Sequence, residues 1–159
     1  MNAQGSPWTG ASARAWRLAA ALCGLVVALD QGAKALIEAN LVPGEHLDVL
    51  GPLGFTLAHN SGVAFGLASG GGAALVALTL AALVFVAVLF ARNPTRPGMW
   101  VAIGLLAGGA LGNLADRIRA DAVTDYVDVF SWPPFNLADV AITVGVVVLA
   151  LSCVGEAER

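Results

Sequence analysis

Two aspartates in the last third of the chain are the residues best suited to chemistry. Asp125 ends the segment Val123-Thr124-Asp125, and Asp139 lies at the start of a long apolar run. Two carboxylates brought within hydrogen-bonding distance cannot both ionise easily, so they share a proton and titrate as a coupled pair. The ionised member takes a proton from water while the protonated member donates to a substrate carbonyl. The two residues therefore predict a water-activating aspartyl dyad.

The surroundings of Asp139 suggest which member carries the shared proton. Pro133-Pro134 precede this residue and favour a helix start, whose partial positive charge stabilises an ionised carboxylate. We therefore expect Asp139 to be the ionised member in the free protein and Asp125 to be the protonated one.

Further polar residues lie at the ends of apolar runs, where they are expensive to keep in a membrane. Asp30 and Lys34 are four residues apart, so on a helix they share a face and can pair. The same spacing argument groups Asn113 with Asp116 and Arg117, and Asn136 with Asp139. A plain salt bridge at the membrane surface remains an alternative for Asp30 and Lys34. We expect these groups to converge at one membrane depth.

The composition indicates that the elements which position these residues are membrane-spanning helices. The 159 residues are 58% hydrophobic and 12% charged, with a mean hydropathy of +0.79, which is typical of a membrane protein. A net charge of −3 and a pI near 5.1 argue against nucleic acid as a partner. The two histidines and two cysteines show no metal-ligand spacing, so we expect no zinc site.

Four apolar runs predict four spanning helices, at about 16–37, 73–91, 99–115 and 138–155. The basic start of the first run also resembles a cleavable signal peptide, but Asp30 to Lys34 contain no cleavage site of small residues. Arginines flank the first span (Arg14 and Arg17) and form the turn between the second and third spans (Arg92 and Arg96). The positive-inside rule places both of these segments on the cytoplasmic side. Both termini are then cytoplasmic, and the polar groups gather near the outer face.

The remaining segments complete a single membrane domain over 14–155, between a mobile tail at 1–13 and a short tail at 156–159. Segments 38–72 and 116–137 face outward, and Pro, Gly and short apolar pieces in the first predict strands and turns. Gly104, Gly108 and Gly112 form a small-residue stripe that lets another helix approach closely. We interpret this stripe as packing.

Over roughly residues 16–155, the chain resembles the lipoprotein signal peptidases (signal peptidase II), which are bacterial membrane aspartyl peptidases. Five blocks carry the resemblance: Asp30-x-x-x-Lys34, Asn60-x-Gly62-x-Ala64-Phe65, Gly108-Gly109-x-x-Gly112-Asn113-x-x-Asp116-Arg117, Val123-Thr124-Asp125 and Phe135-Asn136-x-Ala138-Asp139. Five blocks in order, in a four-span chain of this length, are highly specific.

The resemblance implies that Asp125 and Asp139 are the catalytic residues. It further implies that seven positions orient the dyad and the substrate: Asp30, Lys34, Asn60, Gly62, Asn113, Arg117 and Asn136. The implied fold is mainly α and membrane-integral, with four transmembrane helices, a small extracytoplasmic β-sheet and a mobile flap within 38–72. The implied substrate is a prolipoprotein signal peptide whose Cys carries diacylglycerol, cleaved just before that Cys in the bacterial inner membrane, with no metal or organic cofactor. We expect a monomer surrounded by membrane lipids.

Three other interpretations stay open on the residues alone. Ser61 with Lys34 or His59 resembles a serine hydrolase site, although nothing in the sequence fixes its geometry. A small transporter would use Asp30, Lys34, Arg117 and Asp139 as a proton relay, although relay groups should be spread through the membrane depth. A purely structural membrane subunit leaves the convergence of polar residues unexplained.

Overall fold

The chain folds into four long helices and a small sheet in a computed structural model that describes residues 10–62, 71–130 and 132–154. The helices are α1 (Gly10–Asn40), α2 (Gly71–Arg92), α3 (Met99–Ala120) and α4 (Leu137–Val154). All four are long and apolar enough to cross a membrane. The chain is therefore a multi-pass membrane protein with the predicted number of spans.

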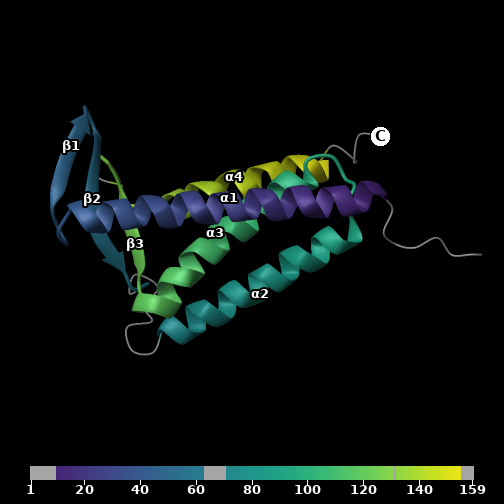
Figure 1. Cartoon of the computed structure of the whole chain (residues 1–159), viewed down its shortest axis with the longest axis horizontal. Coiled ribbons are helices and arrows are strands. Elements are labelled where there is room, and N and C mark those ends of the chain that lie inside the picture. Colours follow the sequence, from purple (N-terminus) through teal and green to yellow (C-terminus); the bar gives the residue numbers. More distant parts are fainter. Residues whose placement is uncertain (1–9, 63–70, 131, 155–159) are drawn as a thin grey trace, which may run out of the picture.

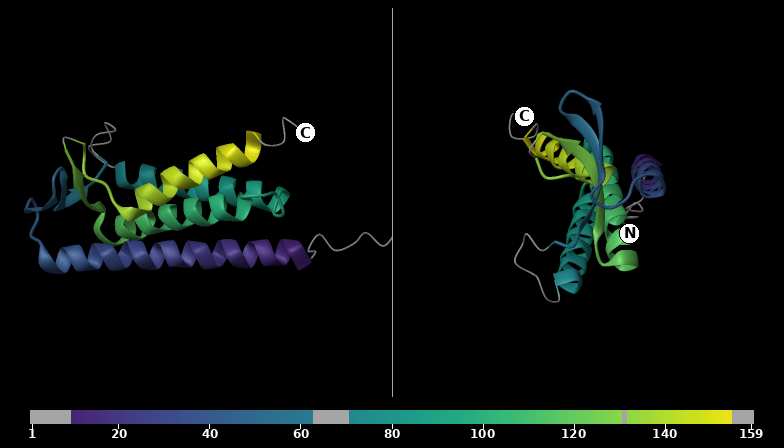
Figure 2. Two further views of the ribbon diagram at one scale, coloured as in Figure 1. Left: turned by 90° about the horizontal axis from the view of Figure 1, so that it is seen from above. Right: turned by 90° about the vertical axis from the view of Figure 1, so that its left-hand side faces the viewer.

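Helix α3 lies at the centre of the bundle. It packs along both α1 and α4 and is the main contact of α2. The end-on view in Figure 2 shows α1 and α4 on either side of α3, with α2 on a third side. Side chains on different faces of α3 near the sheet can thus meet side chains from each of the other helices.

Glycines on α3 allow this close packing, as the small-residue stripe predicted. A Cβ atom at Gly104 or Gly108 would lie within 3.0 Å of α1 backbone or side-chain atoms, and one at Gly109 would collide with the Ala138 carbonyl of α4. Gly112 faces Asp30, whose Oδ2 would lie 2.6 Å from such a Cβ. The glycine positions therefore set the distance at which α1 and α4 approach α3.

The sheet lies across one end of the bundle, called the sheet end below (Figure 1). Its strands are β1 (His46–Leu50), β2 (Leu53–Asn60) and β3 (Val123–Val129), in antiparallel order β1-β2-β3. Strand β3 lies nearest the helices, and Ala58 of β2 pairs with Asp125 of β3. An isolated bridge between Val127 and Phe135 then brings the chain back along β3 to the start of α4.

The opposite end of the bundle holds a compact apolar core. Phe90 of α2 and Met99 of α3 are fully buried, and the ring of Trp16 lies 4.5 Å from that of Phe90. The guanidinium of Arg96 closes this end by donating to the Ser152 and Cys153 carbonyls, where a positive charge favours a helix C-terminus. The helices are thus joined at this end, and α2 separates from α1 toward the sheet end (Figure 1).

The predicted fold class is confirmed, and the differences lie in element bounds. Helix α1 begins at Gly10 rather than at 16, so residues 10–13 are helical and not part of a tail. Helix α3 continues to Ala120, beyond its apolar run, and the segment after it supplies a strand that we did not predict. Part of the flap expected within 38–72 lies at residues 63–70, outside the described residues.

Candidate active site

The first turn of α4 is held by side chains that accept all four of its free backbone N–H groups. The N–H of Asn136 donates to Asp139 Oδ2 (3.2 Å), and the N–H of Asp139 donates back to Asn136 Oδ1 (3.0 Å). Such a reciprocal pair is a capping box. The N–H groups of Leu137 and Ala138 donate to the Tyr126 hydroxyl (3.3 Å) and to Asp30 Oδ1 (3.0 Å). The position of Asp139 is therefore fixed from α1, β3 and α4 itself.

The side chain of Asn136 connects the two candidate catalytic aspartates. Its Nδ2 donates to Asp125 Oδ1 over 2.7 Å, while its Oδ1 and backbone N–H engage Asp139. Asn136 is fully buried, so water does not compete for these bonds. One residue thus contacts both carboxyl groups, that of Asp125 through its side-chain amide and that of Asp139 through its backbone N–H.

Asn113 of α3 supports the same pair from the opposite side. Its Nδ2 donates to Asp139 Oδ1 (2.8 Å), and its Oδ1 accepts from Asn136 (3.1 Å) and from Lys34 Nζ (3.0 Å). The lysine on one side and the carboxylate on the other leave only one orientation for this amide.

Lys34 is buried, and all three of its ammonium hydrogens have acceptors. Nζ lies 2.8 Å from Asp30 Oδ2 and 2.6 Å from Asp116 Oδ2, and the third acceptor is Asn113. Its side chain is 3% exposed, so the pairing is far from the plain surface salt bridge that was the alternative. This buried cluster joins α1 to α3 directly behind Asp139.

Asp125 receives its second hydrogen bond from β2. Asn60 Nδ2 donates to Asp125 Oδ2 over 3.0 Å, and Asn60 Oδ1 accepts from the N–H of Gly62 over 3.0 Å. The φ angle of Gly62 is +76°, a conformation that glycine adopts without strain. Gly62 therefore acts through its backbone, by fixing the amide that holds Asp125.

The environment of Asp125 favours its protonated form. Burial raises the pKa of this carboxyl, hydrogen bonds from Asn60 and Asn136 lower it, and the negative charge of Asp139 raises it again. The positive charge of Lys34 lowers the pKa slightly, and the net shift is upward. A carboxyl with a raised pKa suits a proton donor.

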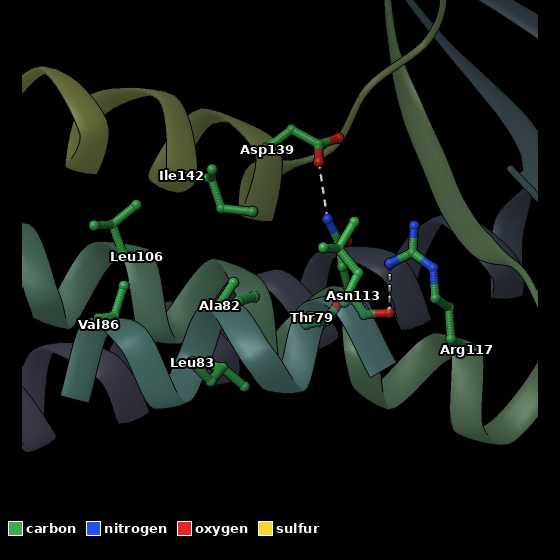
Figure 3. A pocket seen from close by; sticks show the side chains of 11 residues that line it. Thr79, Ala82, Leu83, Val86, Leu106, Asn113, Arg117, Asp139 and Ile142 are labelled. Atoms are coloured by element: carbon green, nitrogen blue, oxygen red, sulfur yellow. Dashed lines mark hydrogen bonds between the residues drawn. The ribbon is translucent and has the colours of Figure 1, made fainter. Parts of the chain in front are cut away.

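A pocket of about 330 Å³ opens beside Asp139 between α2, α3 and α4. Figure 3 shows Asp139, Asn113 and Arg117 at one end of it and apolar side chains along the rest. The apolar lining comes from Leu78, Ala82, Leu83, Val86, Leu106, Ala110 and Ile142, with Thr79 as a further polar member. The pocket therefore has the shape of an apolar channel that ends at a carboxylate.

Arg117 contributes to this pocket without pairing with an acid. Its Nη1 donates to the Asn113 carbonyl over 3.3 Å, one turn back on α3. No ion pair found among residues 10–62, 71–130 and 132–154 includes Arg117. Its positive charge thus remains at the polar end of the pocket, next to Asp139 and Asn113.

The structure brings all nine predicted site residues to the sheet end, and it adds four that sequence reasoning left out. Asp116 had been grouped with Asn113 and Arg117 by helical spacing but had been given no role in the site, and Gln31 had appeared only as a spacer between Asp30 and Lys34. The hydroxyl of Thr124 donates to Glu38 Oε1 over 2.7 Å and ties β3 to α1. Tyr126 caps α4 through its hydroxyl. Gln31 was recognisable as an amide next to a charged spanning residue, whereas the roles of Thr124 and Tyr126 depend on a strand that was not predicted.

Within the described part of the chain, no group of three or more His, Cys, Asp or Glu side chains is arranged to hold a metal ion.

Comparison with known proteins gives a consistent result. Residues 22–155 match the family described as Signal peptidase (SPase) II. The chain is 43% identical over 127 residues to a lipoprotein signal peptidase of Moorella thermoacetica, covering 79% of this chain and 85% of that protein. It is 38% identical over 137 residues to one of Pelotomaculum thermopropionicum, covering 85% and 90%. A solved bacterial membrane enzyme superposes with a TM-score of 0.80 at 30% identity, covering 85% of this chain and 91% of that one.

Proposed function

The chain belongs to the signal peptidase II family, and we propose that it removes signal peptides from diacylglyceryl-modified prolipoproteins by aspartyl catalysis. The observation that carries this proposal is the shared partner Asn136, which donates to the Asp125 carboxyl through Nδ2 and to the Asp139 carboxyl through its backbone N–H. Two carboxyl groups joined through one buried residue influence each other, and the negative charge of Asp139 raises the pKa of Asp125, as in a coupled pair.

The two aspartates have different roles in the first step. Asp139 takes a proton from a water molecule, whose oxygen attacks the carbonyl carbon of the scissile peptide bond. Asp125, whose pKa burial raises, donates its proton to the carbonyl oxygen. The product is a neutral tetrahedral diol, with Asp125 now ionised and Asp139 protonated.

The second step returns the site to its starting state. Asp139 donates its proton to the leaving nitrogen, the C–N bond breaks, and Asp125 recovers a proton from the diol hydroxyl as the carbonyl forms again. The products are the free carboxyl end of the signal peptide and the amino group of the lipid-carrying Cys. No cofactor takes part in either step.

The apolar channel between α2, α3 and α4 supports a membrane-borne substrate. A signal peptide is an apolar segment, and the channel gives it apolar walls up to the carboxylate of Asp139. At the polar end, Arg117 and Asn113 orient the substrate backbone and its lipid-bearing residue. Cleavage just before the lipidated Cys then occurs where the channel changes from apolar to polar.

Membrane orientation follows from the arginines. Arg92 and Arg96 join α2 to α3 at the end opposite the sheet, and Arg14 and Arg17 lie at the same end of α1. The positive-inside rule assigns this end to the cytoplasm of the bacterial inner membrane and the sheet end to the outer face. The dyad then lies near the outer interface, and both termini are cytoplasmic. One protomer contains every member of the site, so we propose a monomer.

The test is cleavage of a purified prolipoprotein in detergent, with and without its diacylglyceryl group. We expect mass spectrometry to show a signal peptide ending just before the Cys, formed only from the lipidated substrate. Reaction in H₂¹⁸O should label the new carboxyl group by one oxygen atom. Equal cleavage of the unmodified substrate, or cleavage elsewhere, would reject the proposed specificity.

A further inference from the structure

The buried cluster around Lys34 contains more acid than base. Asp30 and Asp116 are 0% and 8% exposed, and Lys34 is the one ammonium that contacts both carboxylates. Burying a charge without a compensating partner is costly, so the second negative charge must be stabilised by other donors. Part of this stabilisation comes from the N–H of Ala138, which donates to Asp30 at the start of α4.

The side-chain amide of Gln31 supplies the remaining donors. Its Nε2 lies 2.9 Å from Asp116 Oδ1, 3.3 Å from Asp30 Oδ2 and 3.2 Å from the Gly112 carbonyl. Gln31 thus connects the two carboxylates, at the Asp116 oxygen that Lys34 does not contact and at the Asp30 oxygen that it does, and fixes both to the backbone of α3. Asp30 can reach this position because residue 112 lacks a side chain.

Arg119 fixes which way this amide points. Its Nη2 donates to Gln31 Oε1 over 2.6 Å from the exposed end of α3. An amide rotated by half a turn would present N–H groups to the guanidinium and its oxygen to two carboxylates. Arg119 therefore selects the orientation in which Gln31 donates to the acids.

We propose that Gln31, oriented by Arg119, is a positioning residue for the dyad, an inference that rests on the proposed function. It acts through an unbroken series of contacts: Gln31 holds Asp116, Asp116 holds Lys34, Lys34 donates to Asn113, and Asn113 donates to Asp139. Without Gln31, the Asp116 carboxylate that accepts from Lys34 is no longer held in place. Lys34 then no longer fixes the orientation of the Asn113 amide beside Asp139.

Because Lys34 is charged, the positioning role of Gln31 should also be visible in the pH dependence of activity. Lys34 contacts Asp30 from α1 and Asp116 from α3, and its charge also acts on Asp125 of β3, which the charge of Asp139 from α4 affects in the opposite direction. Because Lys34 lowers the pKa of Asp125, displacement of Lys34 lets that pKa rise. The activity that depends on protonated Asp125 then persists to higher pH.

The experiment compares Gln31→Met, which keeps the length of the side chain and removes its hydrogen bonds, with wild type on the lipidated substrate. We expect kcat to fall about tenfold with KM unchanged, since small misplacements of reacting groups are costly. The basic limb of kcat should move to higher pH. Arg119→Met, at an exposed position, should change both quantities in the same direction but less. The double variant should resemble Gln31→Met alone, because both residues act through one amide.

Ile118→Ala, next to Arg119 and 70% exposed, serves as the matched control and should leave all three quantities unchanged. Wild-type kcat in Gln31→Met overturns the inference, as does a loss that follows the folded fraction with an unmoved pH limb. If Gln31→Met does not fold, the kcat and pH limb of Arg119→Met decide instead. Asp125→Asn is assayed in parallel, and residual cleavage there would reject the proposed function rather than the role of Gln31.

Discussion

Asn136 Nδ2 lies 2.7 Å from Asp125 Oδ1, so the N-cap residue of α4 also holds the strand-borne aspartate. The same side chain accepts from the N–H of Asp139 through Oδ1. The side chain of Asn136 therefore both caps α4 and holds Asp125, through two different atoms. A substitution that keeps only one of these hydrogen bonds can separate the two roles.

Asn136→Ser should separate capping from catalysis. Serine still accepts from the N–H of Asp139, so stability should remain within about 0.5 kcal/mol of wild type. It has no amide for Asp125, and cleavage should fall about 100-fold. Asn136→Ala should lose the same activity and in addition about 1 kcal/mol of stability. Thermal unfolding and cleavage rates measure both; an active Asn136→Ser enzyme would show that Asp125 does not need this bond.

Asn60→Ala should move the basic limb of the pH profile upward. The Asn60 amide donates to ionised Asp125 and lowers its pKa, so its removal leaves burial and the charge of Asp139 to raise that pKa further. Because the protonated form of Asp125 is the proton donor, activity should extend to higher pH although its maximum falls. The readout is kcat against pH. The exposed neighbour His59→Ala is the control, and a downward shift in Asn60→Ala would assign the limb to another group.

The sequence was sufficient for the spans and for the convergence of the candidate site residues at one end of the bundle, but not for their connections. Apolar length gave four helices, and five motif blocks named Asp125, Asp139 and the amides around them. The pairing of the third strand was not predictable, because Val123–Val129 contains three polar residues and its partners in β2 lie 63 to 76 residues away in sequence. The roles of Thr124 and Tyr126 depend on that pairing. The start of α1 was missed because residues 10–13 lack apolar periodicity.

Lys34→Met should destabilise the protein strongly. It leaves the buried carboxylates of Asp30 and Asp116 without their shared cation, which costs about 3–5 kcal/mol. Adding Asp116→Asn should recover part of the loss, because one uncompensated charge is removed. Thermal unfolding in detergent is the measurement. Asp48→Asn removes an exposed partner of His46 and should change stability by less than about 0.5 kcal/mol. Equal effects of Lys34→Met and Asp48→Asn would contradict the assigned burial.

Gly112→Ala should impair both packing and catalysis. The new Cβ would lie 2.6 Å from Asp30 Oδ2, so the Asp30 carboxylate must shift and its ion pair with Lys34 is disturbed. We expect a loss of about 1–3 kcal/mol, typical of overpacking, together with reduced cleavage. Gly24→Ala on α1 is the matched control, since nothing lies within 4 Å of its added Cβ, and it should be neutral or stabilising. Wild-type stability in Gly112→Ala would show that this contact is not tight.

The most direct test of the aspartyl mechanism compares three Asp→Asn variants with Ser61→Ala in cleavage of the lipidated prolipoprotein. Asp128 is the matched control, because it lies on the same strand as Asp125 and contacts His46 instead of the dyad. We expect Asp125→Asn and Asp139→Asn to be folded and inactive, with Asp128→Asn and Ser61→Ala close to wild type. Cleavage by either dyad variant, or its loss in Ser61→Ala alone, would contradict the account.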